Sequence, residues 1–461
     1  MSENNFSRRK FLTGAAAIGA AGAMGVGTFS SCASGGSGTA ASGGGSYDWA
    51  TREYKYPPML DEVPAGNVLK AGIIGCGGRG SGAAVNFIEA GGTTVQVTAL
   101  ADTFKDRLDA CVKKIKEETG QDVPAENCFV GFDAYEKVID SGVDIVILAT
   151  PPKFRPEHFE AAVKARKHVF MEKPVAVDPT GIRQVLAAAK MADAAGLKVV
   201  TGTQRRHQHK YVELFKACNE NNAIGKITGA NVYWNGGKLW HRDNNPSWSE
   251  MEWMIRDWVN WCWLSGDHIV EQHVHNLDVA NWFIGKAPVK ALGFGSRQRR
   301  VTGDQYDNFS VDYVYDDGMH IHSTCRQINS CTNAVNEIIH GTNGRTFSSG
   351  SGNPNTISDL AGNVIQEFAS HETSPYVQEH KNLITCIRQD IAFNEAEATA
   401  ISNMVALMGR VSAYTGKEVT YDEMMNSDMK LGPDTYVMGD IGYIAKAEVP
   451  VPGSLERPPR N

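Results

Sequence analysis

The sequence predicts an α/β protein with two parts: a doubly wound parallel sheet, then an α+β domain with a large, open and mainly antiparallel sheet. Three observations support this prediction. A glycine-rich turn at Gly75–Gly80 directly follows an apolar, β-branched run at 68–74. Strand-like and helix-like segments then alternate up to residue 201, which is typical of parallel βα units. Beyond Gly202, apolar residues recur at every second position, which is typical of antiparallel strands.

The overall composition indicates a multidomain globular protein. The chain of 461 residues is long enough for two or three domains. Its formal net charge of −7 argues against binding to nucleic acid, which needs a basic surface to meet the phosphates. The nine cysteines include no Cys-x-x-Cys pair, so neither a zinc site nor a disulfide framework is indicated.

Residues 1–31 predict a Tat-type export signal. Arg8 and Arg9 precede a weakly apolar stretch at 13–29 that is rich in Ala and Gly, and twin arginines in this position are typical of that signal. A transmembrane anchor is the alternative, but the stretch contains little Leu or Ile. We therefore expect a periplasmic protein, exported in the folded state with its cofactor already bound.

Residues 32–66 predict a lipidation site, a tether and a lead-in to the folded protein. The segment 29–32, Phe-Ser-Ser-Cys, is similar to a lipobox, in which Cys32 would carry the lipid. Residues 33–46 are almost all Gly, Ser and Ala, so they contain nothing to form a core and predict a flexible tether. We expect a lipoprotein held at the membrane through Cys32. Simple cleavage of the signal is the alternative.

The first folded domain is predicted at 67–201. After the turn, its predicted helices and strands are, in order, 81–90, 95–101, 104–118, 143–149, 156–166, 168–171, 180–195 and 198–201. The apolar run at 143–149 does not alternate with polar residues, which indicates a strand buried on both faces of a parallel sheet.

The second domain is predicted at 202–461 and is expected to bind the substrate. Its predicted elements are a helix at 210–221, strands at 227–234, 291–296, 308–315, 319–326 and 336–341, and helices at 376–388 and 396–415. The stretch Trp234–Trp263 is rich in Trp, Asn, Arg and His and has no clear period. We predict that it is a long loop over a pocket.

The glycine-rich turn predicts a dinucleotide site. It reads Gly75-Cys76-Gly77-Gly78-Arg79-Gly80. In a Rossmann domain the first glycine permits a tight turn, the second lets a pyrophosphate approach the backbone, and the third lets the helix pack closely. Asp102 ends the second predicted strand, where its carboxylate would bond the ribose hydroxyls and repel a 2′-phosphate. No arginine directly follows Asp102, so we expect NAD rather than NADP.

Two further segments carry side chains suited to proton transfer. Lys173, within Glu172-Lys173-Pro174, ends a predicted strand, and an ammonium group there can donate to a hydroxyl or carbonyl oxygen of a substrate. In the segment 266–278, Glu271 and His275 would share one face of a helix. A histidine beside a carboxylate suits a general base.

Two other interpretations of the histidine segment stay open. His275 can be a core histidine satisfied by hydrogen bonds, or Glu271, His273 and His275 can form a metal site, since an extended backbone would align them. Ligand types without confirmed geometry are weak evidence, so we expect no metal.

Together these motifs resemble the Gfo/Idh/MocA oxidoreductase family, which includes glucose–fructose oxidoreductase and inositol dehydrogenase. The resemblance covers about 67–415 and rests on the glycine turn, Ala-Thr-Pro-Pro at 149–152, Glu-Lys-Pro at 172–174 and the histidine segment, in that order. It implies an N-terminal Rossmann domain and a C-terminal domain whose open sheet forms the floor of the substrate pocket. In this family the sheet is commonly an oligomer interface, so we expect a homo-oligomer.

The resemblance also implies roles for individual residues. Lys173 matches the active-site lysine of the family, and His275 matches its catalytic histidine. Glu271 stands where Asp is usual, which keeps the carboxylate, and His273 stands where Gly is usual. Other residues are expected to contact the cofactor, together with Lys173: Thr150, Pro151, His158 and Glu172. A neighbouring segment matches one near the family's active site: Gln204, Arg205 and Arg206.

Members of the family act on sugars and cyclic polyols. The resemblance therefore implies an NAD-dependent oxidation or reduction of a ring hydroxyl of a sugar or glycoside, with C3 of a glycoside as one position. The Trp-rich stretch agrees with this, because aromatic faces suit sugar rings. One alternative is a redox-neutral glycosidase that recycles its NAD, although the α-N-acetylgalactosaminidase group lacks the Lys-Pro kept here at 173–174. The other is a non-catalytic sugar-binding lipoprotein, against which Lys173 and His275 argue.

Overall fold

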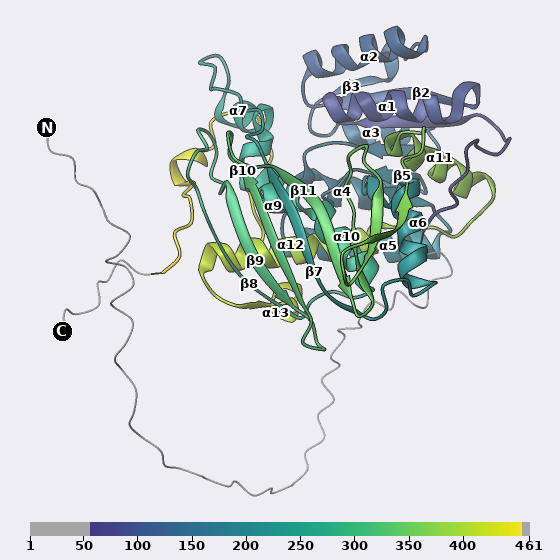
Figure 1. Cartoon of the computed structure of the whole chain (residues 1–461). Coiled ribbons are helices and arrows are strands. Elements are labelled where there is room, and N and C mark those ends of the chain that lie inside the picture. The colour runs from purple at the N-terminus through teal and green to yellow at the C-terminus, as the bar shows by residue number, and fades with distance from the viewer. Residues whose placement is uncertain (1–55, 454–461) are drawn as a thin grey trace, which may run out of the picture. The chain divides into compact units, whose positions relative to one another are not determined.

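The structure is a computed structural model that describes residues 56–453. The predicted export signal, the lipidation site at Cys32 and the tether lie outside these residues. Two sheets organise the described part of the chain, one parallel and one mainly antiparallel (Figure 1). This confirms the predicted fold class.

The N-terminal sheet has six parallel strands in the order β3-β2-β1-β4-β5-β6. The strands are β1 (Leu69–Ile74), β2 (Val95–Asp102), β3 (Cys128–Val130), β4 (Ile145–Leu148), β5 (His168–Met171) and β6 (Val199–Thr201). The helices between them are α1 (Gly78–Gly91), α2 (Lys105–Thr119), α3 (Ala134–Asp140), α4 (Arg155–Lys164) and α5 (Pro179–Ala194). Every residue of β4 is buried, which is why its sequence is apolar without alternation.

The strand order of this sheet reverses between β1 and β4, because β2 lies on one side of β1 and β4 on the other. In doubly wound sheets such a reversal leaves a crevice at the carboxyl ends of the two strands. The glycine turn follows β1 and the Thr150-Pro151 segment follows β4. Both segments therefore meet at the crevice where a dinucleotide is expected.

The C-terminal sheet has nine strands in the order β14-β13-β12-β11-β7-β10-β9-β8-β15. They are β7 (Ile227–Gly236), β8 (Lys290–Ser296), β9 (Asn308–Val314), β10 (His320–Gln327), β11 (Ala334–Gly341), β12 (Gly344–Phe347), β13 (Asn355–Asp359), β14 (Val364–Phe368) and β15 (Val419–Thr420). All neighbours are antiparallel except β7 and β10. Helices α10 (Val274–Ile284) and α12 (Ala396–Thr415) pack on this sheet, and β9 shows the matching alternation of buried and half-buried residues.

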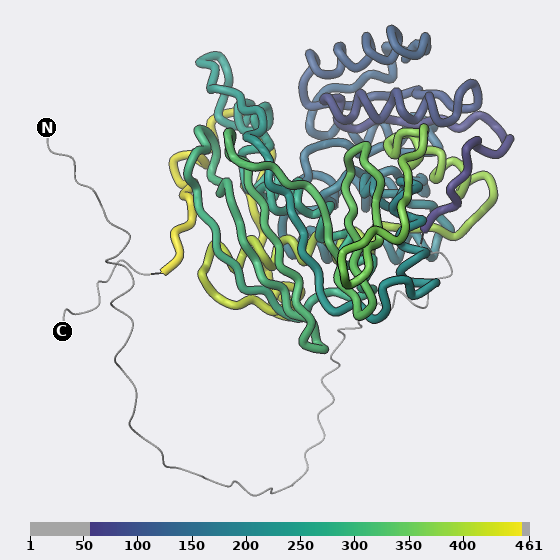
Figure 2. The backbone as a smooth tube through the Cα atoms, in the orientation of Figure 1, coloured from purple at the N-terminus to yellow at the C-terminus, as the bar shows by residue number. Residues whose placement is uncertain are grey.

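One helix of the C-terminal half returns to the N-terminal sheet. Helix α11 (Pro375–Arg388) packs against α1 and β6, and Figure 2 shows this green segment beside the purple first helix. Its buried residues Val377, Leu383 and Ile384 share one apolar core with β1 and α1. The predicted substrate domain at 202–461 therefore contributes a helix to the Rossmann core, which the order of elements along the chain does not indicate.

The stretch Trp234–Trp263 is only partly irregular. It contains the end of β7, helix α7 (Glu250–Arg256) and the first residues of the short helix α8 (Cys262–Ser265). Ser249 caps α7 by accepting a hydrogen bond from the backbone N–H of Glu252. The prediction of a long loop was therefore wrong for 250–256, which form α7, but the stretch does border a pocket, which Trp240 and Trp258 line.

Within residues 56–453, no helix is both long and apolar enough to cross a bilayer. The cysteines of this part of the chain are all unpaired.

Candidate active site

The glycine turn has the backbone geometry that a dinucleotide loop needs. Gly75 has a φ of +96°, and a Cβ there would lie 2.5 Å from the backbone nitrogen of Thr150. A Cβ on Gly80 would lie 1.7 Å from the carbonyl oxygen of Gly75. In contrast, a Cβ on Gly77 or Gly78 would meet nothing within 4 Å. The turn is thus closely packed at Gly75 and Gly80 and open at Gly77 and Gly78. On the open side, the free N–H groups of the α1 N-terminus can receive a pyrophosphate.

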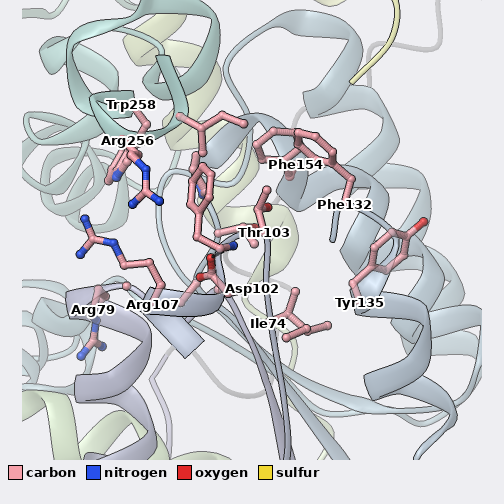
Figure 3. A pocket seen from close by; sticks show the side chains of 18 of the residues that line it. Ile74, Arg79, Asp102, Thr103, Arg107, Phe132, Tyr135, Phe154, Arg256 and Trp258 are labelled. Atoms are coloured by element: carbon pink, nitrogen blue, oxygen red, sulfur yellow. Dashed lines mark hydrogen bonds between the residues drawn. The ribbon is translucent and has the colours of Figure 1, made fainter. Parts of the chain in front are cut away.

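A cavity of about 440 Å³ lies above this open cradle (Figure 3). It is lined by most of the residues expected to contact the cofactor: Gly75, Gly77, Gly78, Arg79, Asp102, Thr150, Pro151 and His158. Gly80 is buried below the turn, while Glu172 and Lys173 lie at the end of the neighbouring strand β5. The space and the open cradle fit a dinucleotide bound across the switch point of the sheet.

Asp102 lies at the edge of the cavity, and its carboxylate also anchors the turn. One oxygen accepts a hydrogen bond from the backbone N–H of Cys76 at 2.7 Å, and the other accepts one from Phe104 at 2.8 Å. Burial raises the pKa of this carboxyl group, although the two backbone donors oppose the rise. A carboxylate has about four acceptor positions, so lone pairs remain for ribose hydroxyls.

At the reactive end, the tertiary structure brings Lys173 and Glu271 together. The ammonium of Lys173 donates to the carbonyl oxygen of Glu271 and, at 3.1 Å, to its carboxylate. Both side chains are only 13 % exposed. Lys173 has three donors, so one remains for a substrate oxygen.

The third residue of the reactive end is His275, whose pKa responds to the charge of Lys173. Its pKa is well below the ordinary value, because the ring is buried and because the positive charges of Lys173, Arg205 and Arg79 disfavour a second proton. Its ring stacks on Trp234 with centroids 5.7 Å apart. No described residue bonds its Nδ1 atom. The ring is therefore in its neutral form, the form in which a histidine nitrogen can accept a proton.

The backbone around these residues does not form the one helix face on which Glu271 and His275 would lie together. Helix α9 (His268–Glu271) ends at Glu271, and α10 begins at Val274. Glu271 and His275 therefore do not share a helix face through their spacing of four. The break frees the backbone carbonyl of Glu271, which accepts from Lys173.

His273 is part of the core rather than of the cavity. It is completely buried, and its Nε2 atom lies 2.6 Å from the hydroxyl of Ser323 on β10. Burial lowers its pKa to about 3. The structure thus does not assemble the alternative metal set of Glu271, His273 and His275. Among the described residues, the group close enough to share an ion is a different one: Asp61, His209 and His371.

Sequence reasoning missed a charged cluster that joins the turn to α11. The guanidinium of Arg79 pairs with Glu172 and with Glu379, and Glu379 is completely buried. Arg79 and Glu379 are 300 residues apart, and no local motif contains Glu379. Burial raises the pKa of Glu379 well above the ordinary value.

The segment after β6 forms buried ion pairs. Arg205 pairs with Glu337 at 2.8 Å and Arg206 with Asp278 at 2.8 Å. Arg205 also lies over the ring of Trp234, 5.6 Å from its centroid. Arg205 is therefore held by a structural partner, and it lies close to the ring that stacks on His275.

The Trp-rich stretch does not line a sugar site as a whole. Trp240 and Trp258 line the dinucleotide cavity near Asp102, whereas Trp261 and Trp263 are buried in a separate apolar cluster. Only Trp234, through its stack on His275, lies at the reactive end.

These features define the class: a Rossmann-fold oxidoreductase with a dinucleotide crevice and a lysine–carboxylate pair at its reactive end. The chain belongs to the Gfo/Idh/MocA family. Residues 69–200 match the family described as "Oxidoreductase family, NAD-binding Rossmann fold", and residues 212–346 match the "GFO/IDH/MocA C-terminal domain". The two matches together span more than half of the chain. The cofactor is NAD, as the matched family description states, and the open cradle at Gly77 and Gly78 fits a dinucleotide.

The most similar curated relatives include sugar- and polyol-related enzymes. The chain is 26% identical over 228 residues to the myo-inositol 2-dehydrogenase of Thermotoga maritima, covering 50% of this chain and 58% of that protein. It is 30% identical over 182 residues to a glycosyl hydrolase family 109 protein of Streptomyces coelicolor, covering 39% of this chain and 35% of that protein. The chain thus spans between a third and three fifths of the length of these two relatives.

Solved structures share the fold over most of the chain. The scyllo-inositol dehydrogenase of Lactobacillus casei, solved with NAD(H) and scyllo-inositol, is 19% identical with a TM-score of 0.58, covering 77% of this chain and 100% of that one. The aldose–aldose oxidoreductase of Caulobacter crescentus is 21% identical with a TM-score of 0.60 over the same shares.

Proposed function

We propose that the protein is an NAD-dependent dehydrogenase that oxidises or reduces a ring hydroxyl of a sugar or glycoside. The single observation that carries this proposal is the reactive end, where the Lys173 ammonium is fixed by Glu271 and the His275 imidazole is kept neutral by burial. NAD, when bound, supplies the hydride acceptor. His275 can take the hydroxyl proton, and the free donor of Lys173 can bond the same oxygen and hold it in place.

A redox-neutral glycosidase is the second candidate. It is supported by the similarity to glycosyl hydrolase family 109 proteins. Oxidation of a glycoside at C3 acidifies the neighbouring C–H, which permits elimination of the glycosidic bond. The same Lys173, Glu271 and His275 would serve both reactions, so these residues do not distinguish the candidates.

The two candidates differ in their products. We would incubate the purified protein with NAD and a panel of p-nitrophenyl glycosides and free sugars, following NADH absorbance and nitrophenol together. NADH formed in proportion to substrate supports the dehydrogenase. Nitrophenol formed with only a catalytic amount of NAD contradicts it in favour of the glycosidase. Sugar binding without either product contradicts both and leaves a non-catalytic sugar-binding protein.

Variants of the reactive end are the controls for this assay. Lys173→Ala and His275→Ala should each lower turnover by about 10²-fold to 10⁴-fold, the usual contribution of a general acid or base. Neither residue lines the cavity at the glycine turn, so NAD should remain bound in both variants. Full activity in either variant would remove that residue from the mechanism.

We also propose that the protein is exported and tethered to a membrane. The support is the Arg8-Arg9 signal and Cys32, which precede the Gly/Ser/Ala-rich stretch at 33–46. Labelling of cells with a radioactive fatty acid should mark the wild-type protein and leave Cys32→Ser unlabelled. Equal labelling of the two proteins would exclude lipidation at Cys32.

A further inference from the structure

The dinucleotide cavity has an outer wall that the Rossmann domain does not supply. Residues 237–258, called the strap here, directly follow β7 and include α7. Five strap residues line the cavity: Trp240, Arg242, Ile255, Arg256 and Trp258. They face Asp102, Thr103, Phe104 and Arg107 on the N-terminal side. Figure 3 shows Arg256 and Trp258 approaching the end of β2, where Asp102 lies.

The position of the strap identifies which part of the dinucleotide it faces. In a Rossmann site the pyrophosphate lies over the glycine turn, and the acidic residue at the end of the second strand bonds the ribose of the adenosine. Asp102 is that residue. The strap therefore covers the adenosine end of the cavity, away from Lys173 and Glu271.

One side chain connects the strap to the Rossmann domain. Arg256 donates from both terminal nitrogens to the two carboxylate oxygens of Asp106, each at 3.0 Å, and from Nε to Glu252 at 2.8 Å. Its guanidinium also lies 4.0 Å from the ring centroid of Phe104. Bidentate pairs of this kind are geometrically specific. The arginine side chain is 13% exposed and the Asp106 side chain is 61% exposed, so solvent reaches the pair from the aspartate side.

The strap is supported from behind by an apolar cluster of its own. Met251, Met254 and Ile255 of α7 are buried with Phe154, Trp261, Trp263 and Leu264. The carboxylate of Glu250 accepts hydrogen bonds from the backbone N–H groups of Ile441 and Ile444 in the C-terminal segment. The N-terminal residues of α7 are thus fixed, and Arg256 at the other end of the helix is held toward Asp106.

Two arginines at the cavity have no carboxylate partner. Among residues 56–453, neither Arg107 nor Arg242 forms an ion pair, whereas Arg79 and Arg256 each pair with two carboxylates. Partial burial lowers the pKa of Arg242, and the nearby charges of Arg107 and Arg256 lower it further. Together with Arg256, these guanidinium groups favour a ligand with an aromatic face, which the adenine ring of the dinucleotide brings.

We propose that the strap forms an adenosine subsite with Phe104 and Arg107, and that the Arg256–Asp106 pair controls how fast the dinucleotide leaves. The adenosine diphosphate half of the cofactor is enclosed between two parts of the chain and departs only after this pair opens. The proposal rests on NAD binding and not on the identity of the substrate. The strap can therefore prove to have no role while the dehydrogenase activity is found, and the activity can be absent while the strap still controls NAD release.

Dissociation of NADH from the intact protein tests the pair. NADH is bound, then chased with excess NAD, and its fluorescence gives the rate of release. Asp106→Asn should release NADH about threefold to tenfold faster, as expected for the loss of one well-placed pair. Asp109→Asn is the matched control, because Asp109 lies on the same helix and pairs with Lys105 instead. Equal release rates in wild type and Asp106→Asn would overturn the role of the pair.

A double variant tests whether Arg256 and Asp106 slow NADH release through their ion pair or through separate effects on the cavity wall. If Arg256 and Asp106 act through each other, Arg256→Gln combined with Asp106→Asn should release NADH no faster than the faster single variant. Additive effects of the two changes on the release rate would contradict control by the Arg256–Asp106 ion pair. Thermal unfolding of each variant shows whether it is folded, and Asp106 is 61% exposed, so its replacement leaves no cavity.

Fragments of the cofactor test the subsite itself. Calorimetry with ADP-ribose and with nicotinamide mononucleotide separates the two halves of the dinucleotide. Arg242→Ala should weaken binding of ADP-ribose about threefold to tenfold and leave the affinity for the mononucleotide unchanged. Unchanged ADP-ribose affinity, or an equal loss for both fragments, would overturn the adenosine subsite.

Discussion

The two ends of the dinucleotide crevice are built in different ways. At the glycine turn, the decisive contacts join backbone atoms, and the fit comes from missing side chains: Gly80 packs under Gly75, and Gly77 faces open space. At the reactive end, the contacts join charged side chains from distant parts of the sequence. Lys173 meets Glu271 across 98 residues, and Arg205, which follows β6, meets Glu337 on β11. The contacts at the glycine turn are therefore specified by a short stretch of sequence, whereas those at the reactive end depend on how distant segments pack in the folded protein.

The electrostatics differ in the same way. The turn needs no charged side chain to receive a pyrophosphate, because helix N–H groups serve that purpose. At the reactive end two buried cations have carboxylate partners, in the pairs Lys173–Glu271 and Arg205–Glu337, whereas, among the described residues, the buried Arg155 donates only to backbone carbonyl oxygens. Burial and the positive charges of Lys173 and Arg205 lower the pKa of His275, so this histidine stays neutral beside charged groups that are themselves paired.

The largest expected effect comes from filling the tight side of the turn. In Gly80→Ala the new Cβ would lie 1.7 Å from the carbonyl oxygen of Gly75, and neither backbone segment can move away cheaply. We expect the free energy of unfolding to fall by about 3 kcal/mol or more, together with loss of NAD binding. Urea unfolding and calorimetry measure the two effects.

Two neighbouring glycines serve as controls for that experiment. Gly82→Ala, in the same helix with no atom near its Cβ, should be stabilising by about 0.5–1 kcal/mol. Gly77→Ala should leave stability nearly unchanged but weaken NAD binding, because its Cβ would occupy the open cradle. Similar losses of stability in Gly80→Ala and Gly77→Ala would contradict the distinction between a packed and an open side of the turn.

A smaller effect is expected from His273, a buried histidine in the core. Burial lowers the pKa of His273 to about 3, from an unfolded value of about 6.5. Between these values the unfolded chain binds a proton that the folded chain does not, so the contribution of His273 to stability is present above pH 6.5 and is lost as the pH falls. His273→Asn should therefore reduce the slope of unfolding free energy against pH by about 1.4 kcal/mol per pH unit.

This slope is measured by urea unfolding at several pH values between about 6 and 4, a range within the titration window. Ser323→Ala is the control, because it removes the hydrogen-bond partner of His273 without removing a titrating group. Its curve should keep the wild-type slope. Parallel curves for wild type and His273→Asn would show that the ring is protonated in the folded protein.

Sequence patterns predicted long regular elements well and short or polar ones poorly. The apolar run at 143–149 and the amphipathic pattern at 396–415 gave β4 and α12 within two residues at each end. Strands β12 to β14 are short and partly exposed, so they carry little periodic signal. On a helix, Glu271 and His275 would have shared one face, but residue spacing does not reveal the break at Gln272 and His273.

The sequence by itself determined the parallel sheet, the glycine turn and the use of NAD, because glycine spacing and apolar periodicity act within one βαβ unit. Only the tertiary structure decided which partners hold Lys173 and Arg79, that His273 lies in the core, and that residues 237–258 cover the adenosine end of the cavity. Those outcomes depend on contacts between segments far apart in the chain. Such contacts are selected by the packing of whole layers, and the sequence around each residue does not specify its distant partner.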